Sequence, residues 1–245
     1  MVAGLEKGLA IIEAFDQSRP RLSLSEAAAV TGLTRAAARR YLLTLTRLGY
    51  AEFDGKFFSL TPRILRLGYA YASSAKLPAR VQPALEQISA ATGESSSAAI
   101  LEDRSIVYIA RSATRRIMSI SLTVGTHLPA YCTSMGRVLL AWSDAATLSA
   151  YLADAPFEKL TAKTRTTEAE LREELALVRR DGYALIDEEL ELGLRSIAVP
   201  VFDSRERLVC AVNIGVQAAR MSIADMPARM LPALQAAQAE LRRIV

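Results

Sequence analysis

The sequence predicts an α+β protein with an N-terminal winged helix-turn-helix and a larger C-terminal domain built on a central antiparallel sheet. Two short helical patterns flank a glycine between Leu22 and Leu48. Asp54-Gly55 follows between two aromatic-rich runs, which is a strong hairpin signal. Beyond residue 79, strand patterns come in two groups with helical patterns between and after them, as in α+β domains. The predicted division is residues 1–61, a linker helix over 62–77, and a domain over 78–245.

The pattern between Leu22 and Leu48 carries its own start and stop signals. Ser23 and Glu26 have the spacing of a capping box, in which each side chain satisfies the other residue's backbone N–H. Gly32 ends the first helix, because glycine tolerates the positive φ of a sharp corner. Thr34 can cap the second helix. This order predicts a helix-turn-helix, although an ordinary helical hairpin with solvated arginines shares parts of the pattern.

The second helix has one apolar face and one basic face. Arg35 and Arg39 lie opposite the apolar stripe, with Arg40 beside them. In a helix-turn-helix the second helix enters the major groove N-terminus first. The stripe consists of Ala38, Tyr41, Leu42, Leu45 and Leu48. The residues predicted to contact DNA are Thr34, Arg35, Arg39 and Arg40.

The neighbouring segments fit the same unit. A stripe of Leu5, Leu9, Ile12 and Phe15 predicts a first helix that covers the helix-turn-helix. The Asp54-Gly55 hairpin is interpreted as the wing, with a plain surface hairpin as the alternative. Thr61-Pro62 opens the linker helix. Apolar residues lie around much of that helix, so we expect it to pack against a second copy of itself or against the other domain.

Charge and composition narrow the class of protein. Residues 1–80 hold 12 Lys and Arg against 6 Asp and Glu, whereas the remainder holds 18 against 20. Basic charge therefore gathers with the helix-turn-helix, as a polyanion partner requires. Two isolated cysteines and one histidine argue against a disulfide, a zinc cluster, another metal site or any cofactor. Without a signal peptide or a membrane-length apolar run, we expect a cytoplasmic protein with no membrane contact.

The C-terminal domain is predicted as alternating elements. A helix ends at Thr92-Gly93, and the first two strands join at Asp103-Arg104. The predicted strands cover 96–101, 106–111, 117–122, 183–187, 194–202 and 207–215. The predicted later helices cover 134–142, 145–153, 167–181 and 225–243.

A loop rich in Gly and Pro leads into the helix at 134–142, and Thr133, Ser134 and Gly136 stand at its start. Free N–H groups and hydroxyls at a helix start form an anion site. Arg137 and the upstream His127 are candidates to add donors. The alternative is that Thr133 or Ser134 only caps the helix.

Other polar groups are weaker candidates. An acidic cluster between two strands is interpreted as a solvated loop rather than a cation site. Ser196 and Asn213 are polar residues in apolar strands, so each needs a backbone or ligand partner. Ser134 lies outside a G-x-S-x-G elbow, which argues against a hydrolase. The acidic cluster contains Asp187, Glu188, Glu189 and Glu191.

The chain resembles the IclR-type bacterial transcription regulators over nearly its whole length. The segments that carry the resemblance are Leu24–Leu42, Leu128–Ala141 and Gly193–Pro200. The resemblance implies a winged helix-turn-helix joined to a GAF-like effector domain. It also implies dimers formed through the N-terminal part, often tetramers, that bind a palindromic double-stranded DNA operator.

Two segments, Thr114–Ile120 and Pro129–Ser134, resemble the branch that controls aromatic catabolism through the β-ketoadipate pathway. That branch implies a small aromatic or dicarboxylic acid effector: protocatechuate, 4-hydroxybenzoate or β-ketoadipate. The carboxylate of such a ligand suits the helix start at Ser134. The effector positions implied by the family, together with His127, are Ile117, Ile120, Ser134, Met135, Ile186, Ser196, Asn213 and Gly215.

Two departures from the family pattern matter. His127 stands where arginine is expected, which would make charge recognition pH-sensitive, and Ile186 replaces an acidic residue. Two other hypotheses stay open at this stage. One is an enzyme of aromatic-acid metabolism that uses the C-terminal pocket, and the other is an interaction module without a ligand.

Overall fold

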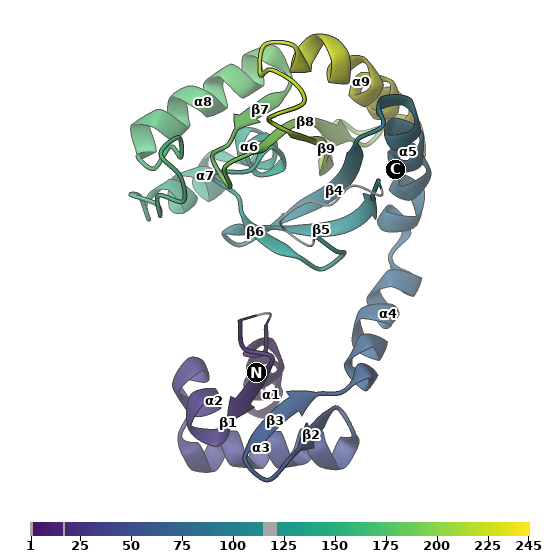
Figure 1. The fold of residues 1–245 in the computed structure, drawn as a ribbon. Helices are drawn as coiled ribbons and strands as arrows, with labels where there is room; N and C mark the ends of the chain where they lie inside the picture. Colours follow the sequence, from purple (N-terminus) through teal and green to yellow (C-terminus); the bar gives the residue numbers. More distant parts are fainter. Residues whose placement is uncertain (1, 17, 115–121) are drawn as a thin grey trace. The chain divides into compact units, whose positions relative to one another are not determined.

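The structure is a computed structural model of the 245-residue chain that describes residues 2–16, 18–114 and 122–245, with the side chains of 72–74 left out. The chain divides into two compact units, Met1–Ser74 and Ala75–Val245, each with its own hydrophobic core (Figure 1). In the described residues no helix combines the length and the apolar character needed to cross a bilayer.

The N-terminal unit combines a helix-turn-helix with a small sheet. Its β1 strand precedes the helix-turn-helix and pairs with β3, so the sheet order is β1-β3-β2. The elements are α1 (Ala3–Glu13), β1 (Arg21–Ser23), α2 (Leu24–Thr31), α3 (Arg35–Leu48), β2 (Ala51–Phe53), β3 (Phe57–Leu60), a 3-10 turn (Pro62–Ile64) and α4 (Leu65–Ser74).

The signals at the helix-turn-helix act as predicted. The carboxylate of Glu26 accepts from the Ser23 N–H at 2.8 Å, and Ser23 Oγ accepts from the Glu26 N–H at 3.3 Å. Gly32 has φ +65°, in the left-handed region that a side chain disfavours. Thr34 Oγ1 accepts from the backbone N–H of Ala37 and caps α3. Local hydrogen bonding therefore fixes the corner between α2 and α3.

The predicted buried stripe of the first helix is wrong at its start. Leu5 and Leu9 are 66 % and 45 % exposed, whereas Ile11 is fully buried. A Cβ added at Gly4 or Gly8 would lie 3.9 Å from the Tyr41 side chain, at ordinary van der Waals distance, so α1 lies against α3 at these positions. Leu5 and Leu9 line a groove together with these glycines and Tyr41, and both leucines stay open to solvent there.

The wing forms, with its turn moved by one residue. The Asp54 N–H donates to the Phe57 carbonyl, so Gly55 and Lys56 occupy the centre of the turn in place of Asp54 and Gly55. The Asp54 carboxylate accepts from the backbone N–H groups of Lys56 and Phe57, and these hydrogen bonds lower the pKa of Asp54 below its usual range. Asp54, which was predicted at the centre of the turn, therefore stabilises the turn from its first position.

The linker helix is exposed along most of its described length. Leu65 is 71 % exposed and Leu67 is 46 % exposed. Within the described part of its own unit these leucines stay exposed. The expectation that a second copy or the other domain covers this helix stays a prediction.

The C-terminal unit is a six-stranded antiparallel sheet of order β6-β5-β4-β9-β8-β7 with helices on both faces (Figure 1). The α5 and α9 helices pack on one face, and α6 packs on the other with α8 beside it. The predicted strand at 117–122 falls mainly on residues outside those described. The elements are α5 (Lys76–Thr92), β4 (Ser95–Glu102), β5 (Ser105–Ser112), β6 (His127–Pro129), α6 (Ser134–Ala141), α7 (Ala145–Leu152), α8 (Glu168–Asp181), β7 (Ala184–Asp187), β8 (Leu194–Phe202), β9 (Leu208–Gln217) and α9 (Met226–Ile244).

Candidate functional site

The outer face of α3 presents the basic residues that the sequence predicted for DNA. Arg35, Arg39 and Arg40 are exposed, and Thr34 stands at the start of the helix. Among the described residues no carboxylate forms an ion pair with any of these three arginines. The buried face of α3 is formed by Ala38, Leu42 and Leu45, so the arginines point away from the core.

The small sheet adds two cations that the sequence interpretation did not assign to DNA, Lys56 in the wing and Arg21 on the neighbouring strand β1. The Arg21 guanidinium carbon lies 5.1 Å and Lys56 Nζ lies 5.0 Å from the centroid of the Phe57 ring. Arg21 is also 3.3 Å from the Asp54 carboxylate, and both side chains are largely exposed. A basic wing beside a basic helix start is suited to contacting DNA phosphates.

A cavity lies where the sheet face under α6 changes from alanine to small polar residues. Ser97 pairs with Arg111 on β5 and with Asn213 on β9, so the three form one row across the sheet. In the next row, Gly215 lies between Ser95 and Ser196, and Ser196 pairs with Ile186. Further along the same face, Ala99, Ala198 and Ala211 pack in the core with α6. The small polar rows leave the space that α6 does not fill.

Six of the predicted effector residues meet in this cavity. They come from three strands and from the start of α6, and they are Ser134, Met135, Ile186, Ser196, Asn213 and Gly215. The lining residues that the sequence interpretation did not assign are Ser95, Ser97, Tyr108, Arg111, Leu122, Cys132, Thr133, Leu190 and Leu194.

Three predicted effector residues do not join them in the described structure. His127 lies exposed on β6, with Nδ1 3.7 Å from the Glu102 carboxylate, and it is not among the lining residues. Ile117 and Ile120 lie outside the described residues. The cavity is therefore built without the only histidine.

The start of α6 forms one wall. Thr133 Oγ1 accepts from the Gly136 N–H at 3.2 Å and caps the helix. A Cβ at Gly136 would collide with the backbone of Ala130, so only glycine lets the helix start fold back on its own loop. Ser134 is 1 % exposed, and within the described chain its Oγ is buried without a hydrogen-bond partner. Such an orphaned hydroxyl calls for a ligand or water.

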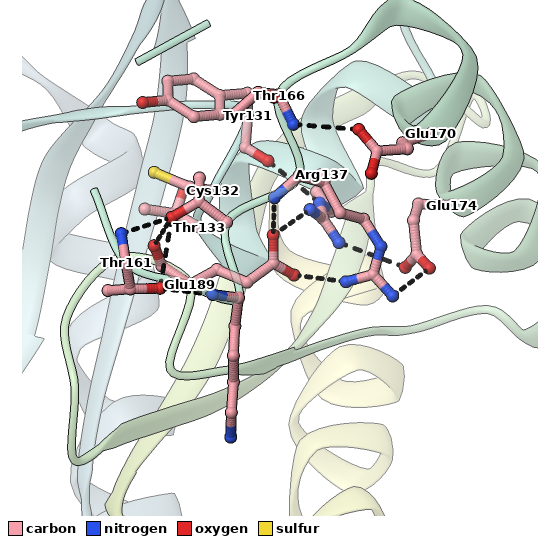
Figure 2. Close-up of polar contacts among 12 residues, drawn as sticks. Tyr131, Cys132, Thr133, Arg137, Thr161, Thr166, Glu170, Glu174 and Glu189 are labelled. Atoms are coloured by element: carbon pink, nitrogen blue, oxygen red, sulfur yellow. Dashed lines mark hydrogen bonds and ion pairs between the residues drawn. The ribbon is translucent and has the colours of Figure 1, made fainter. Parts of the chain in front are cut away.

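Arg137 turns away from the cavity, which corrects the expectation that it adds charge there. It is fully buried and donates to Glu189 at 2.6 Å, to Glu174 at 3.1 Å and to the Tyr131 carbonyl at 3.0 Å (Figure 2). Burial lowers the pKa of Arg137, and the two glutamates oppose that shift. The charge of Arg137 is thus compensated inside the domain.

The acidic loop is also not the solvated segment that the sequence suggested. Glu189 is 1 % exposed, and its carboxylate accepts from the side chain of Arg165 at 2.8 Å as well as from Arg137 (Figure 2). Asp187 and Glu188 both pair with Lys163, each at 2.7 Å. Among the described residues no group of His, Cys, Asp and Glu has the arrangement of a metal site.

The cation that lines the cavity is Arg111. Its Nη1 donates to Ser97 Oγ at 3.3 Å, and burial lowers its pKa from the ordinary value. Among the lining residues that the structure describes, there is no Asp or Glu. Arg111 is therefore a positive charge without a carboxylate partner in the described structure.

A β-bulge explains why the sequence did not reveal Arg111. Ala98 pairs with Ala110 but Ala99 pairs with Tyr108, so Ile109 is an extra residue in β5. Regular alternation from Ile106 and Tyr108 would place Ala110 on the cavity face. The bulge shifts the phase and brings Arg111 there instead.

Two family models match the chain. The IclR helix-turn-helix domain matches residues 4–55, and the bacterial transcriptional regulator IclR C-terminal domain matches residues 69–243. The second match alone covers more than half of the chain.

Known proteins with similar sequences and structures agree with the two family matches. The Pca regulon regulatory protein of Pseudomonas putida is 43 % identical over 241 residues, 98 % of this chain and 83 % of its own length. A transcriptional regulator from Rhodococcus is 46 % identical with a TM-score of 0.83, covering 99 % of this chain and 97 % of its own. A mutant PobR inducer-binding domain from Acinetobacter, in complex with 3-hydroxybenzoic acid, is 32 % identical with a TM-score of 0.66. It covers 70 % of this chain and 100 % of its own.

These relatives are transcription regulators, and none of them is named as an enzyme. Three observations lead to one assignment. They are a basic helix-turn-helix unit, a separate domain with a polar-lined cavity, and the two family matches. The chain belongs to the IclR family of bacterial transcriptional regulators.

Proposed function

We propose that this regulator of aromatic catabolism binds a small organic acid in the C-terminal cavity and that the acid changes its affinity for an operator. The observation that carries the proposal is Arg111, a cation without a carboxylate partner among the described residues of an otherwise neutral cavity. Organic anions are the ligands that compensate such a charge. The likeness to a Pca regulator and to a PobR domain holding 3-hydroxybenzoic acid supports aromatic acids.

The effector contacts come from the predicted residues that line the cavity. Ser134 and Met135 would approach the ligand from the helix wall. Ser196, Asn213 and Gly215 would approach it from the sheet wall, with Ile186 at the edge strand. His127 is left out of this set because it lies exposed on β6.

DNA binding is proposed for the outer face of α3, where Thr34, Arg35, Arg39 and Arg40 would meet the major groove. Lys56 of the wing and Arg21 of β1 would contact the adjacent DNA backbone. A palindromic operator presents two equivalent half-sites, so it needs two copies of this unit. We place this activity in the cytoplasm.

A groove in the N-terminal unit supports the second copy. Its lining includes Leu5, Leu9, Leu48 and Leu67, and it joins α1, α3 and α4. Exposed apolar patches of this kind mark interaction sites. We propose that the groove receives the same surface of a second chain. Leu9→Glu should convert the dimer to a monomer in sedimentation velocity, whereas Leu177→Glu on the exposed side of α8 should not. A dimer that survives Leu9→Glu would contradict the proposed surface.

The function is tested with the full chain and three ligands: 4-hydroxybenzoate, protocatechuate and β-ketoadipate. A ligand at 100 times its Kd stabilises the folded state by about 2.7 kcal/mol, so the melting temperature of the C-terminal unit should rise. The same ligand should change the affinity for a duplex selected by the protein from a random library. If all three ligands leave both quantities unchanged, the proposed function is wrong.

A further inference from the structure

The cavity offers a ligand two different polar ends. One is the row formed by Arg111, Ser97 and Asn213 on the sheet wall. The other is the start of α6, where Ser134 Oγ is buried without a partner within the described chain. The rest of the lining includes the apolar side chains of Met135 and Ile186 and the ring of Tyr108. We infer that the effector is a hydroxylated aromatic monocarboxylate whose carboxylate binds Arg111 and whose ring hydroxyl binds at Ser134. This inference rests on the proposed function.

The position of the carboxylate follows from charge. A guanidinium carries a full positive charge and binds a carboxylate with two parallel hydrogen bonds, which are about twice as strong as neutral ones. The start of α6 offers only a partial charge of roughly half a unit. A ligand that placed its carboxylate at Ser134 would leave Arg111 uncompensated in a half-buried position. The carboxylate therefore belongs at Arg111, contrary to the orientation expected from the sequence.

Arg137 does not offer a rival site for the carboxylate. It lies within four residues of Ser134, but its guanidinium is bound to Glu174, Glu189 and the Tyr131 carbonyl. It is fully buried and does not line the cavity. Within the described part of the chain, the helix start consequently has no side-chain cation of its own.

The helix start instead suits a neutral hydroxyl. Thr133 already caps Gly136, so the N–H groups of the first turn and Ser134 Oγ remain to meet the ligand. A phenol oxygen can accept from an N–H while its O–H donates to Ser134 Oγ. A second carboxylate would lose its hydration there and gain no full opposite charge. The cavity should thus prefer 4-hydroxybenzoate to a dicarboxylate such as adipate.

A ligand series tests the orientation with the full chain, by calorimetric titration of 4-hydroxybenzoate, benzoate, 4-hydroxybenzamide and adipate. Arg111→Gln should lower affinity for 4-hydroxybenzoate about 10- to 100-fold, the range for hydrogen bonds to a charged group. It should abolish the preference over 4-hydroxybenzamide and keep the preference over benzoate. Ser134→Ala should do the reverse and lower 4-hydroxybenzoate affinity about 3- to 10-fold.

Matched controls separate recognition from folding. Arg229→Gln on α9 and Ser149→Ala on α7 change exposed residues outside the cavity and should alter neither preference. Arg111→Lys keeps the charge and should keep part of the preference for the carboxylate. Circular dichroism of each variant checks that it folds.

The outcomes are distinct. The inferred orientation is overturned if Ser134→Ala removes the preference over 4-hydroxybenzamide, or if adipate binds the wild type more tightly than 4-hydroxybenzoate. If the wild type binds none of the four ligands but binds β-ketoadipate, the monocarboxylate inference fails and the proposed function stands. If it binds no acid at all, both fail.

Discussion

The two units use arginine in opposite ways. In the N-terminal unit, Arg35 and Arg39 lie on the outside of α3 without a carboxylate partner among the described residues. In the C-terminal unit, Arg137 is buried and bound by two glutamates, while Arg111 faces a cavity whose described lining contains no acid. The comparison indicates that the arginines without a carboxylate partner are the ones that bind ligands. An arginine that is already paired with carboxylates stabilises the fold instead.

The largest effect should come from breaking the compensated site. Arg137→Met leaves Glu189 and Glu174 without one of their arginine partners and removes three hydrogen bonds. Removing one member of a buried ion pair costs about 3–5 kcal/mol. The melting temperature of the C-terminal unit should fall sharply in calorimetry. Arg172→Met breaks only an exposed pair with Glu168 and should cost less than about 1 kcal/mol. Equal losses for the two variants would break the comparison.

A smaller effect should come from removing the open arginines of α3. Arg35→Ala and Arg39→Ala should each weaken DNA binding by about 1–3 kcal/mol and leave the stability of the unit nearly unchanged. Fluorescence anisotropy with the selected duplex, at several salt concentrations, measures affinity and the salt slope. Arg229→Ala serves as the charge-matched control outside the interface. If the variant that carries both Arg35→Ala and Arg39→Ala keeps the wild-type affinity and salt slope, another face binds DNA.

The capping threonine of α3 tests whether its hydrogen bond or only its position matters. Thr34→Ala removes the acceptor of the Ala37 N–H and should destabilise the N-terminal unit by about 1 kcal/mol. Thr44→Ala, an exposed threonine within the same helix, should change stability much less. Chemical denaturation of the two variants gives the difference. If Thr34→Ala lowers the free energy of unfolding no more than Thr44→Ala does, the Thr34 cap does not stabilise α3.

The smallest effect concerns the cavity cysteine. Burial raises the pKa of Cys132 to about 12, well above that of a free thiol, and burial does the same for Cys210. At pH 9 both folded thiols are protonated, whereas the unfolded ones are about half ionised. Iodoacetamide should therefore label neither cysteine of the native protein within the time that labels the denatured one. By the same linkage, stability falls as pH rises above 9. Rapid labelling of native Cys132 would show an open, ionised thiol.

Sequence reasoning worked where structure is local. The Ser23–Glu26 capping box, the Gly32 corner and the Thr34 cap depend on neighbours within four residues, and all three are present. The long strands and helices of the C-terminal unit also follow their periodic patterns. The three-residue strands β1 and β6 were missed, because segments of that length show no period.

It failed where partners are distant in the chain. Nothing around Arg137 shows that Glu174 and Glu189 will neutralise it, and nothing around Arg111 shows the bulge that turns it inward. The exposure of Leu5 and Leu9 depends on how α1 packs against α3, which a helical pattern alone does not contain. Six of the residues that line the cavity were among those predicted for the effector, but nine others, including Arg111, were not.

Glu189 and Leu190 are adjacent in the chain, yet the first is held by Arg137 and Arg165 while the second lines the cavity. Arg137, Arg165, Glu174 and Glu189 hold this part of the domain, and none of them lines the cavity. Mutational drift at the lining positions can therefore retune which compound is sensed while the supporting framework stays intact. A biosensor engineer can randomise the lining and leave that framework untouched.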